Sequence, residues 1–310
     1  MPAGPVNPEG LSGILNVAKP VGMTSHDVVA FVRRQTGQRR VGHAGTLDPA
    51  AAGVLLVCLG DATRLSEFLL ESNKQYRATI RLGAVSTTDD AEGIITPSAS
   101  SVDHLALPTI TAVLRRFQGE IEQVPPAFSA IKVGGQALYR SARAGQVVQA
   151  PSRRVRIDRI EILTWIPPDL TIDVTCSKGT YIRALARDIG RVLGVGGYLR
   201  SLLRTASGSF RLDDSLSLEE IARAAALGYL DRLLYPPDAA VSNWPALFLP
   251  AELVRALSRG LPVPGPPAHD GQPARAYSED GYMVGLVRYR HADGRWHPDK
   301  VFAEANRESS

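Results

Sequence analysis

Cysteine is scarce in this sequence, because the 310 residues include only Cys58 and Cys176. Each lies in an apolar run that has the pattern of a buried strand, and the two do not form a disulfide framework or a zinc-binding cysteine pair. We interpret both as small core residues that stay reduced. This usage predicts a protein of a reducing compartment, most simply the cytoplasm.

Several cofactor signatures are also missing. The six histidines, at positions 26, 43, 104, 269, 291 and 297, include no pair with the spacing of a helical metal site. The sequence has no Walker-type phosphate loop, no strand–GxGxxG–helix and no GxSxG nucleophile elbow. We therefore expect no bound metal and no nucleotide or dinucleotide cofactor, which leaves the chemistry to protein side chains.

Long hydrophobic runs are absent too. No apolar run reaches the roughly 18 residues that a transmembrane helix requires. Residues 1–12 lack the basic start and apolar stretch of a signal peptide and are rich in proline and glycine, so we expect a disordered leader. Apolar residues make up 44% of the chain and charged residues 21%, which is typical of a soluble globular protein. The length predicts two domains.

Positive charge is concentrated in one part of the chain. The net charge is +4, but residues 140–211 contain 13 Arg and Lys against 5 Asp and Glu, a local excess of +8. A solvated surface would account for this excess, and so would a phosphate-bearing partner. Residues 246–310 contain 8 basic and 8 acidic residues, so charge does not mark them as a nucleic-acid module.

Hydrophobic periodicity predicts alternating strands and helices. We expect strands over 14–17, 54–59, 74–83, 153–163 and 170–177, and helices from Thr24 or Ser25 to Gly37 and over 61–70, 111–119 and 179–194. The last helix has a buried stripe and an arginine at every fourth position; the stripe is Ile182, Leu185, Ile189 and Leu193, and the arginines are Arg183, Arg187 and Arg191. Residues 86–108 are polar and predict a surface connection, and the proline-rich stretch 235–250 predicts a boundary before a small β domain.

The stretch GHAGTLDPAAAGVL, residues 42–55, surrounds one carboxylate, Asp48, with small and apolar residues. Asp followed by Pro is a good helix start, because Asp caps free N–H groups and Pro fits the first helical position. Gly53 would end such a helix after about one turn, and residues 54–59 have the pattern of a buried strand. The alternative interpretation places Asp48 on a loop entering a central strand, where functional side chains are often presented.

Five motifs occur in a fixed order: KPVGMTSHDVV, RVGHAGTLDPAAAGVLLVCLGDATR, KQYRATIRLG, VPPAFSAIKVGGQALYRSARAG and CSKGTYIRALARDIG. They resemble the motifs of TruB-type tRNA pseudouridine synthases over about residues 11–210. The resemblance implies isomerisation of uridine to pseudouridine at position 55, in the TΨC loop of tRNA, by base flipping and without a cofactor. The C1′–N1 bond breaks and a C1′–C5 bond forms. Attack on the sugar, attack on the base and a glycal route all stay open.

The resemblance also implies an α+β fold, the pseudouridine synthase fold. This fold has a mixed, mostly antiparallel sheet with flanking helices, an inserted thumb and a small C-terminal β domain, PUA-like in many members. We expect a catalytic domain over 13–235, an RNA-gripping insertion at about 109–152 and the C-terminal domain over 246–305, which in the family touches the acceptor arm. The arginines expected in or after the insertion are Arg140, Arg143, Arg153, Arg154 and Arg156.

By the same resemblance, Asp48 is the catalytic aspartate that attacks the nucleotide, and Arg183 pairs with it. Burial alone would raise the pKa of the Asp48 carboxyl, and an adjacent guanidinium would oppose that rise and fix the orientation of the carboxylate. Tyr76, which periodicity alone predicts to be a core tyrosine, packs against the target base in the family and is a candidate proton acceptor. The other residues expected to bind substrate are His43, which could stack on an extruded base, Tyr181 and Leu202. Lys19 and Pro20 are interpreted as mainly structural.

The resulting prediction is a monomeric enzyme that acts on the T arm of tRNA, without a membrane or protein partner. Two alternatives stay open. One is a non-catalytic RNA-binding protein or tRNA-folding chaperone on the same scaffold, and the other is a related synthase that modifies another RNA. The presence of Asp48, Tyr76 and Arg183 argues against a loss of catalysis.

Overall fold

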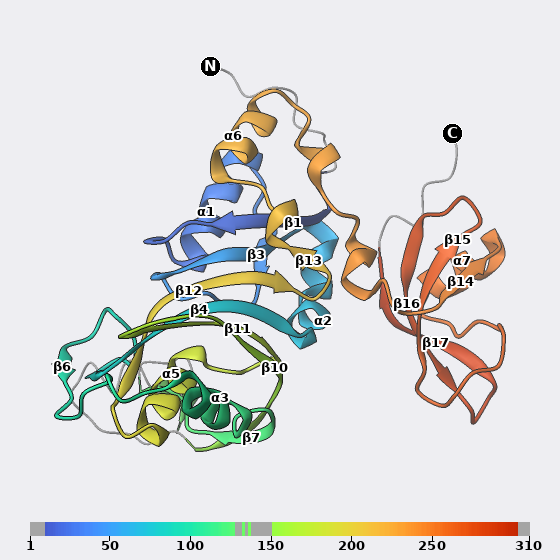
Figure 1. Cartoon of the computed structure of the whole chain (residues 1–310). Helices are drawn as coiled ribbons and strands as arrows, with labels where there is room; N and C mark the ends of the chain where they lie inside the picture. The colour runs from blue at the N-terminus through green and yellow to red at the C-terminus, as the bar shows by residue number, and fades with distance from the viewer. Residues whose placement is uncertain (1–9, 128–131, 134–135, 138–150, 303–310) are drawn as a thin grey trace.

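The structure is a computed structural model that describes residues 10–127, 132–133, 136–137 and 151–302. It contains a large sheet covered by helices and a separate four-stranded sheet near the C-terminus (Figure 1). Residues 1–9 of the predicted leader, the middle of the predicted insertion, Arg140 and Arg143 lie outside the described residues. No helix within the described ranges is long and apolar enough to cross a membrane.

Nine strands form the large sheet: β1 (Gly13–Lys19), β2 (Val41–Ala44), β3 (Ala51–Leu59), β4 (Lys74–Leu82), β7 (Gly119–Gln123), β10 (Arg153–Ile166), β11 (Asp169–Cys176), β12 (Gly197–Ser207) and β13 (Phe210–Arg211). Their spatial order is β1–β3–β12–β4–β11–β10–β7, with β2 beside β3 and β13 beside β12. All neighbours are antiparallel except β3 and β12, which run parallel. The predicted mixed, mostly antiparallel sheet is confirmed.

Helices pack on this sheet in two groups (Figure 1). The helices α1 (Ser25–Thr36) and α6 (Leu218–Ala226) share a core with β1 and β3, whereas α3 (Leu107–Arg115) and α5 (Ile182–Val192) share a core with β4, β10 and β11. The helix α1 begins with a capping box between Thr24 and Asp27 and ends at Gly37, which has a left-handed φ of 66°. Of the two predicted caps, Thr24 is therefore the correct one.

The C-terminal sheet consists of β14 (Ala246–Leu249), β15 (Pro273–Ser278), β16 (Met283–Arg290) and β17 (Arg295–Val301), with the helix α7 (Ala251–Ser258) packed on it. It has its own apolar core, which includes Leu257, Val263 and Trp296. The predicted small C-terminal β domain is confirmed. A further cluster, which includes Leu65, Val241, Leu286 and Phe302, joins this sheet to the segment before β4.

Several local predictions differ from the structure. The helix predicted over 111–119 corresponds to α3, which begins earlier, at Leu107, and ends at Arg115. The last predicted helical residue, Gly119, is instead the first residue of β7. The helix predicted over 61–70 is a 3-10 turn, η1 (Gly60–Leu65), followed by α2 (Ser66–Glu71). Leu193 lies beyond the end of α5 and is only partly buried. The remaining short elements are β5 (Ala84–Ser86), β6 (Ile95–Pro97), β8 (Lys132–Val133), β9 (Gln136–Ala137), η2 (Leu212–Asp214), η3 (Leu230–Leu233) and η4 (Pro237–Val241).

The strand β12 is central to the sheet, although periodicity does not predict it. It pairs with β4 along most of its length and with β3 at residues 51–53, and bulges interrupt its pairing with β4 near Arg200 and Thr205. The bulges break the alternation of apolar and polar residues by which a strand is recognised. At Gly53, which pairs with Arg204, a Cβ atom would lie 2.2 Å from the Arg204 carbonyl oxygen, so only glycine fits this crossing.

Candidate active site

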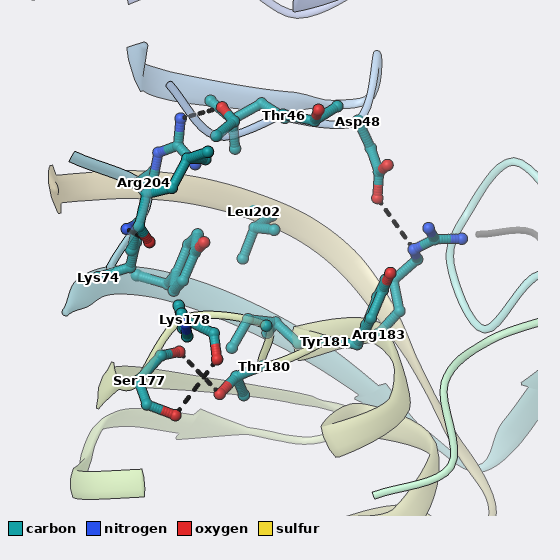
Figure 2. A pocket seen from close by; sticks show the side chains of 16 residues that line it. Thr46, Asp48, Lys74, Ser177, Lys178, Thr180, Tyr181, Arg183, Leu202 and Arg204 are labelled. Atoms are coloured by element: carbon teal, nitrogen blue, oxygen red, sulfur yellow. Dashed lines mark hydrogen bonds and ion pairs between the residues drawn. The ribbon is translucent and has the colours of Figure 1, made fainter. Parts of the chain in front are cut away.

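A cavity of about 530 Å³ opens between the loop before β3 and the loop between β11 and α5. Its floor is formed by β4 and β12. The lining residues are Gly45, Thr46, Leu47, Asp48, Leu70, Lys74, Tyr76, Ser177, Lys178, Gly179, Thr180, Tyr181, Ile182, Arg183, Leu202 and Arg204. Figure 2 shows Asp48 facing Arg183 at one end, Lys74 and Arg204 at the other, and Leu202 between them.

Asp48 lies on a loop, and no helix follows it. The Ala51 N–H donates to the Asp48 carbonyl at 3.0 Å, and β3 begins at Ala51. The helix-start interpretation is therefore wrong and the loop interpretation is confirmed. The side chain of Asp48 is 40% exposed, so the carboxylate is open to the cavity while its backbone is fixed to a central strand.

Two buried side chains from the first motif hold this loop. The Ser25 hydroxyl accepts from the Leu47 N–H at 2.9 Å and lies 3.1 Å from the Leu47 carbonyl oxygen. The Lys19 ammonium donates to the Pro49 carbonyl of this loop at 3.4 Å, and to the carbonyls of Pro20 at 2.8 Å and Met23 at 2.6 Å. Burial lowers the pKa of Lys19, and the nearby negative charge of Asp48 opposes this effect. These contacts support the structural interpretation of Lys19.

Arg183 lies on the first turn of α5 and is shared between two carboxylates. Its Nε is 3.0 Å from Asp48 Oδ2, and its Nη1 is 3.4 Å from Asp90 Oδ2. Nη1 also donates to the Thr88 carbonyl at 3.3 Å. Only 8% of the Arg183 side chain is exposed, so it is a buried cation and not part of a solvated basic stripe. The predicted pairing of Arg183 with Asp48 is present in the structure.

Asp90 was not found from the sequence, because residues 86–108 were predicted to be a surface connection. That prediction is wrong for Asp90, which is 7% exposed. The carboxylate of Asp90 accepts from the Thr88 hydroxyl and from the Glu92 N–H. Turn-forming residues around Asp89 and Asp90 predicted a surface turn, but the arginines that these acids contact, Arg187 and Arg183, are more than 90 residues away in the sequence.

The next arginine of α5 is also tied to this segment. Arg187 forms ion pairs with Asp89 at 2.9 Å and with Asp188 at 3.1 Å. Burial raises the pKa of Asp89, although the Arg187 guanidinium opposes the rise. Arg191 is exposed and lies 3.3 Å from Asp188. The residues 88–90 therefore bind α5 through both Arg183 and Arg187.

Tyr76 lies on β4, directly across from Arg204 on β12. Tyr76 is 9% exposed, and burial raises the pKa of its hydroxyl above the ordinary value of 10. Arg204 is 1% exposed and donates to the carbonyls of Val54 at 2.6 Å and Gly45 at 3.1 Å. Sequence reasoning missed Arg204, because its strand was not predicted. Arg204 fixes the far wall of the cavity by joining β12 to the segment that carries Asp48.

Lys74, two residues before Tyr76 on β4 and on the same buried face, closes the same wall. Its ammonium donates to the carbonyls of Leu69, Leu70 and Ser72 at 3.1, 2.8 and 2.5 Å. These are carbonyls at and just beyond the end of α2, where a cation is favourable. Burial lowers the pKa of Lys74 to about 8.

Of the remaining predicted residues, Tyr181 and Leu202 line the cavity and His43 does not. Tyr181 is the residue before α5, and Leu202 projects from β12 into the cavity (Figure 2). His43 lies on β2, with its ring 5.3 Å from that of His26 in an edge-on contact. Burial lowers the pKa of His43. A role of His43 at the substrate stays a prediction.

The cavity thus combines an exposed carboxylate, a buried guanidinium that orients it, a buried phenol and an apolar wall. Such a carboxylate can act as a nucleophile or base toward a planar, neutral group placed against Tyr76 and Leu202. No group of three or more His, Cys, Asp or Glu that could hold a metal ion occurs among the residues described.

Two family models match the chain. The N-terminal domain of the TruB family of pseudouridylate synthases matches residues 33–182, and the tRNA pseudouridylate synthase B C-terminal domain matches residues 183–242. The division falls between Ile182 and Arg183 at the start of α5, so both matched regions contribute to the cavity.

Relatives and solved structures agree with these matches. The tRNA pseudouridine synthase B of Symbiobacterium thermophilum is 48% identical over 254 residues, which cover 81% of this chain and 83% of the relative. That of Pseudomonas aeruginosa is 40% identical over 294 residues, which cover 94% and 96%.

Two solved structures share the fold over 98% of this chain at 26% identity. One is an H/ACA RNP bound to a substrate RNA containing 2′-deoxyuridine, with a TM-score of 0.74 and 89% of that chain covered. The other is an archaeal box H/ACA sRNP Nop10–Cbf5 complex, with a TM-score of 0.73 and 90% of that chain covered. With these matches, the chain belongs to the TruB family of pseudouridylate synthases, which are isomerases.

Proposed function

We propose that this enzyme isomerises uridine to pseudouridine at position 55 of tRNA, in the TΨC loop. The observation that carries the proposal is the ion pair between Asp48 and Arg183 on the wall of the cavity. Relatives that cover most of the chain are named tRNA pseudouridine synthase B, which supports tRNA as the substrate class.

In the proposed reaction the target uridine leaves the folded loop and enters the cavity. Tyr181 and Leu202 flank the uracil, and Asp48 attacks the nucleotide at the sugar or the base or starts a glycal route. The C1′–N1 bond breaks, the base turns, and a C1′–C5 bond forms; the proton on C5 moves to N1, so product and substrate have the same atoms. Arg183 keeps the attacking carboxylate oriented, and Tyr76 assists the proton transfer.

Extrusion of the uridine costs a few kcal/mol of lost stacking, which binding must offset. The arginines Arg153, Arg154 and Arg156 on β10 are suited to the RNA backbone, since folded RNA is recognised largely by shape and phosphate contacts. Arg140 and Arg143 were assigned the same role from the sequence. We further propose that residues 13–235 catalyse the reaction and that the C-terminal domain, 246–305, contacts the acceptor arm.

We also propose that the enzyme works as a monomer in the cytoplasm. Cys58 and Cys176 are both buried and free, which suits a reducing compartment. Size-exclusion chromatography with light scattering tests the oligomeric state, and a mass of two chains at working concentration would overturn the monomer.

The direct test is incubation of the purified protein with an unmodified tRNA transcript, followed by mapping of pseudouridine through chemical adducts and sequencing. We expect product at the TΨC loop alone. Product only at another position, or only in another RNA, would replace position 55 as the target. Tight binding of tRNA without any product would instead favour an RNA-binding or tRNA-folding protein on this scaffold.

A further inference from the structure

Gln123 is the last residue of β7 and is 1% exposed, which is unusual for a side-chain amide. Its side chain makes two hydrogen bonds with the backbone of a single residue, Tyr181. The Tyr181 N–H donates to Gln123 Oε1 at 2.8 Å, and Gln123 Nε2 donates to the Tyr181 carbonyl at 3.0 Å. The side-chain amide therefore donates one hydrogen bond to the Tyr181 backbone and accepts one from it, as the backbone of a paired strand residue would.

Tyr181 is a position where the backbone needs such support. It is the N-cap residue of α5, and its side chain makes no capping hydrogen bond. Its carbonyl also accepts the first helical hydrogen bond, from the Leu185 N–H at 3.0 Å. Gln123 thus fixes the start of α5 from β7. The residue that it holds, Tyr181, lies two positions before Arg183.

The strand beside β7 holds the ring of the same residue. Arg153 is paired with Gln123 in the β7–β10 register, and its guanidinium lies 5.1 Å from the centroid of the Tyr181 ring. The neighbouring Val124 carbonyl accepts from Arg187 Nη2 at 2.9 Å. Contacts from β7 and β10 therefore converge on the segment that presents Tyr181 and Arg183 to the cavity.

We propose that Gln123 is a positioning residue for the isomerisation, acting through the Tyr181 backbone to place the Tyr181 ring and the Arg183 guanidinium on the cavity wall. This inference rests on the proposed function. Gln123 does not line the cavity itself. The loss of its two hydrogen bonds lets the start of α5 shift, and displacements of about 1 Å at a reacting group can slow a reaction about 100-fold.

The test compares Gln123→Met with a matched control, Gln38→Met. Methionine has nearly the same length as glutamine and removes both hydrogen bonds. Gln38 makes the same pair of contacts with one backbone residue, Leu11: its Oε1 accepts from the Leu11 N–H at 2.8 Å, and its Nε2 donates to the Leu11 carbonyl at 2.8 Å. Gln38 follows α1 and is not a lining residue of the cavity.

Single-turnover rates at saturating enzyme, tRNA Kd and Tm are measured for both variants and for the native protein. We expect the single-turnover rate of Gln123→Met to fall by about 10- to 100-fold and its tRNA Kd to change by less than about threefold. The assay is run well below the Tm of every variant. Gln38→Met should keep the native rate. An unchanged rate in Gln123→Met, a change in Kd alone, or an equal rate loss in Gln38→Met would overturn the proposal.

If Gln123→Met does not fold, Gln123→Glu decides the question. Glutamate keeps an acceptor for the Tyr181 N–H, and once ionised it loses the donor to the Tyr181 carbonyl. Because burial favours the protonated acid, which keeps a donor, the rates of Gln123→Glu and of the native protein are compared from about pH 7 to 9. A rate below native in this range supports the proposal, and a native rate throughout the range overturns it. Failure of the native protein to form pseudouridine would refute the proposed function, whereas an active native protein with a native-like Gln123 variant would refute only this inference.

Discussion

Replacement of Arg183 by methionine should separate the two tasks of this cation, stability and catalysis. The substitution leaves two carboxylates without their shared partner. Removal of one partner from a buried ion pair costs about 3–5 kcal/mol. Asp48 is 40% exposed and regains water, so the cost falls mainly on Asp90, whose side chain is 10% exposed. Asp90 keeps its contacts with the Thr88 hydroxyl and Glu92 N–H, and we expect the free energy of unfolding to fall by about 2–3 kcal/mol.

The effect on catalysis should be at least as large. Without the guanidinium at 3.0 Å, the Asp48 carboxylate loses the contact that orients it, and we expect the single-turnover rate to fall by about 100-fold or more. Arg183→Lys keeps the charge, but one ammonium replaces a planar fork that reaches Asp48 through Nε and Asp90 through Nη1. We expect about a tenfold loss for this variant.

The assay measures pseudouridine formation on an unmodified tRNA with enzyme in excess, together with tRNA Kd at several salt concentrations and thermal unfolding. We expect a small change in Kd, because Arg183 is buried against protein carboxylates. A normal single-turnover rate in Arg183→Met would refute the ion-pair reasoning. A weaker Kd whose salt slope falls by about 0.7–0.9 would instead identify Arg183 as a phosphate contact.

Three further predictions concern single side chains. Asp48→Asn should fold with a Tm close to native, since the side chain is 40% exposed, and should bind tRNA but form no pseudouridine; turnover by this variant, free of native enzyme, would contradict the assignment. Tyr76→Phe should bind tRNA and lose most of its single-turnover rate if the hydroxyl transfers a proton, whereas an active Tyr76→Leu would show that Tyr76 serves only the core. Burial lowers the pKa of His43 below 6.5, so the unfolded chain binds a proton first as the pH falls, and stability should decrease below about pH 6.5. Tm values at about pH 7.5 and 5.5 should show a smaller decrease for His43→Gln than for the native protein, and an equal decrease would contradict this origin.

Much of the fold was predictable, because it depends on local patterns. The alternation in 74–83 predicts β4, and Gly37 predicts the end of α1, whose start the sequence left open between Thr24 and Ser25 as caps. The pattern failed at β12, where bulges interrupt the alternation, and at 61–70, where a 3-10 turn precedes the short helix. The failure at β12 does not reflect a missing apolar signal, since pairing partners far along the chain decide both the course of a strand and its bulges.

Some residues of the candidate site were likewise predictable from the sequence, and others were not. The sequence excluded a long helix after Asp48, because Gly53 and a buried strand follow it closely, and the structure then decided for the loop over a single helical turn. The motif resemblance indicated Arg183, Tyr76, Tyr181 and Leu202, all of which line the cavity.

Only the tertiary structure decided which charges and amides meet. Arg183 occupies a helix position that periodicity predicts to be part of a basic stripe, yet Asp90 and Asp48 bury it from two distant segments. Gln123 contacts the Tyr181 backbone, and Arg204 contacts the segment that carries Asp48, through hydrogen bonds to residues 58 or more positions away. Local sequence fixes backbone propensity and the buried face of each element, but the energy of an ion pair or hydrogen bond depends on distances of about 3 Å, which only the packed chain sets.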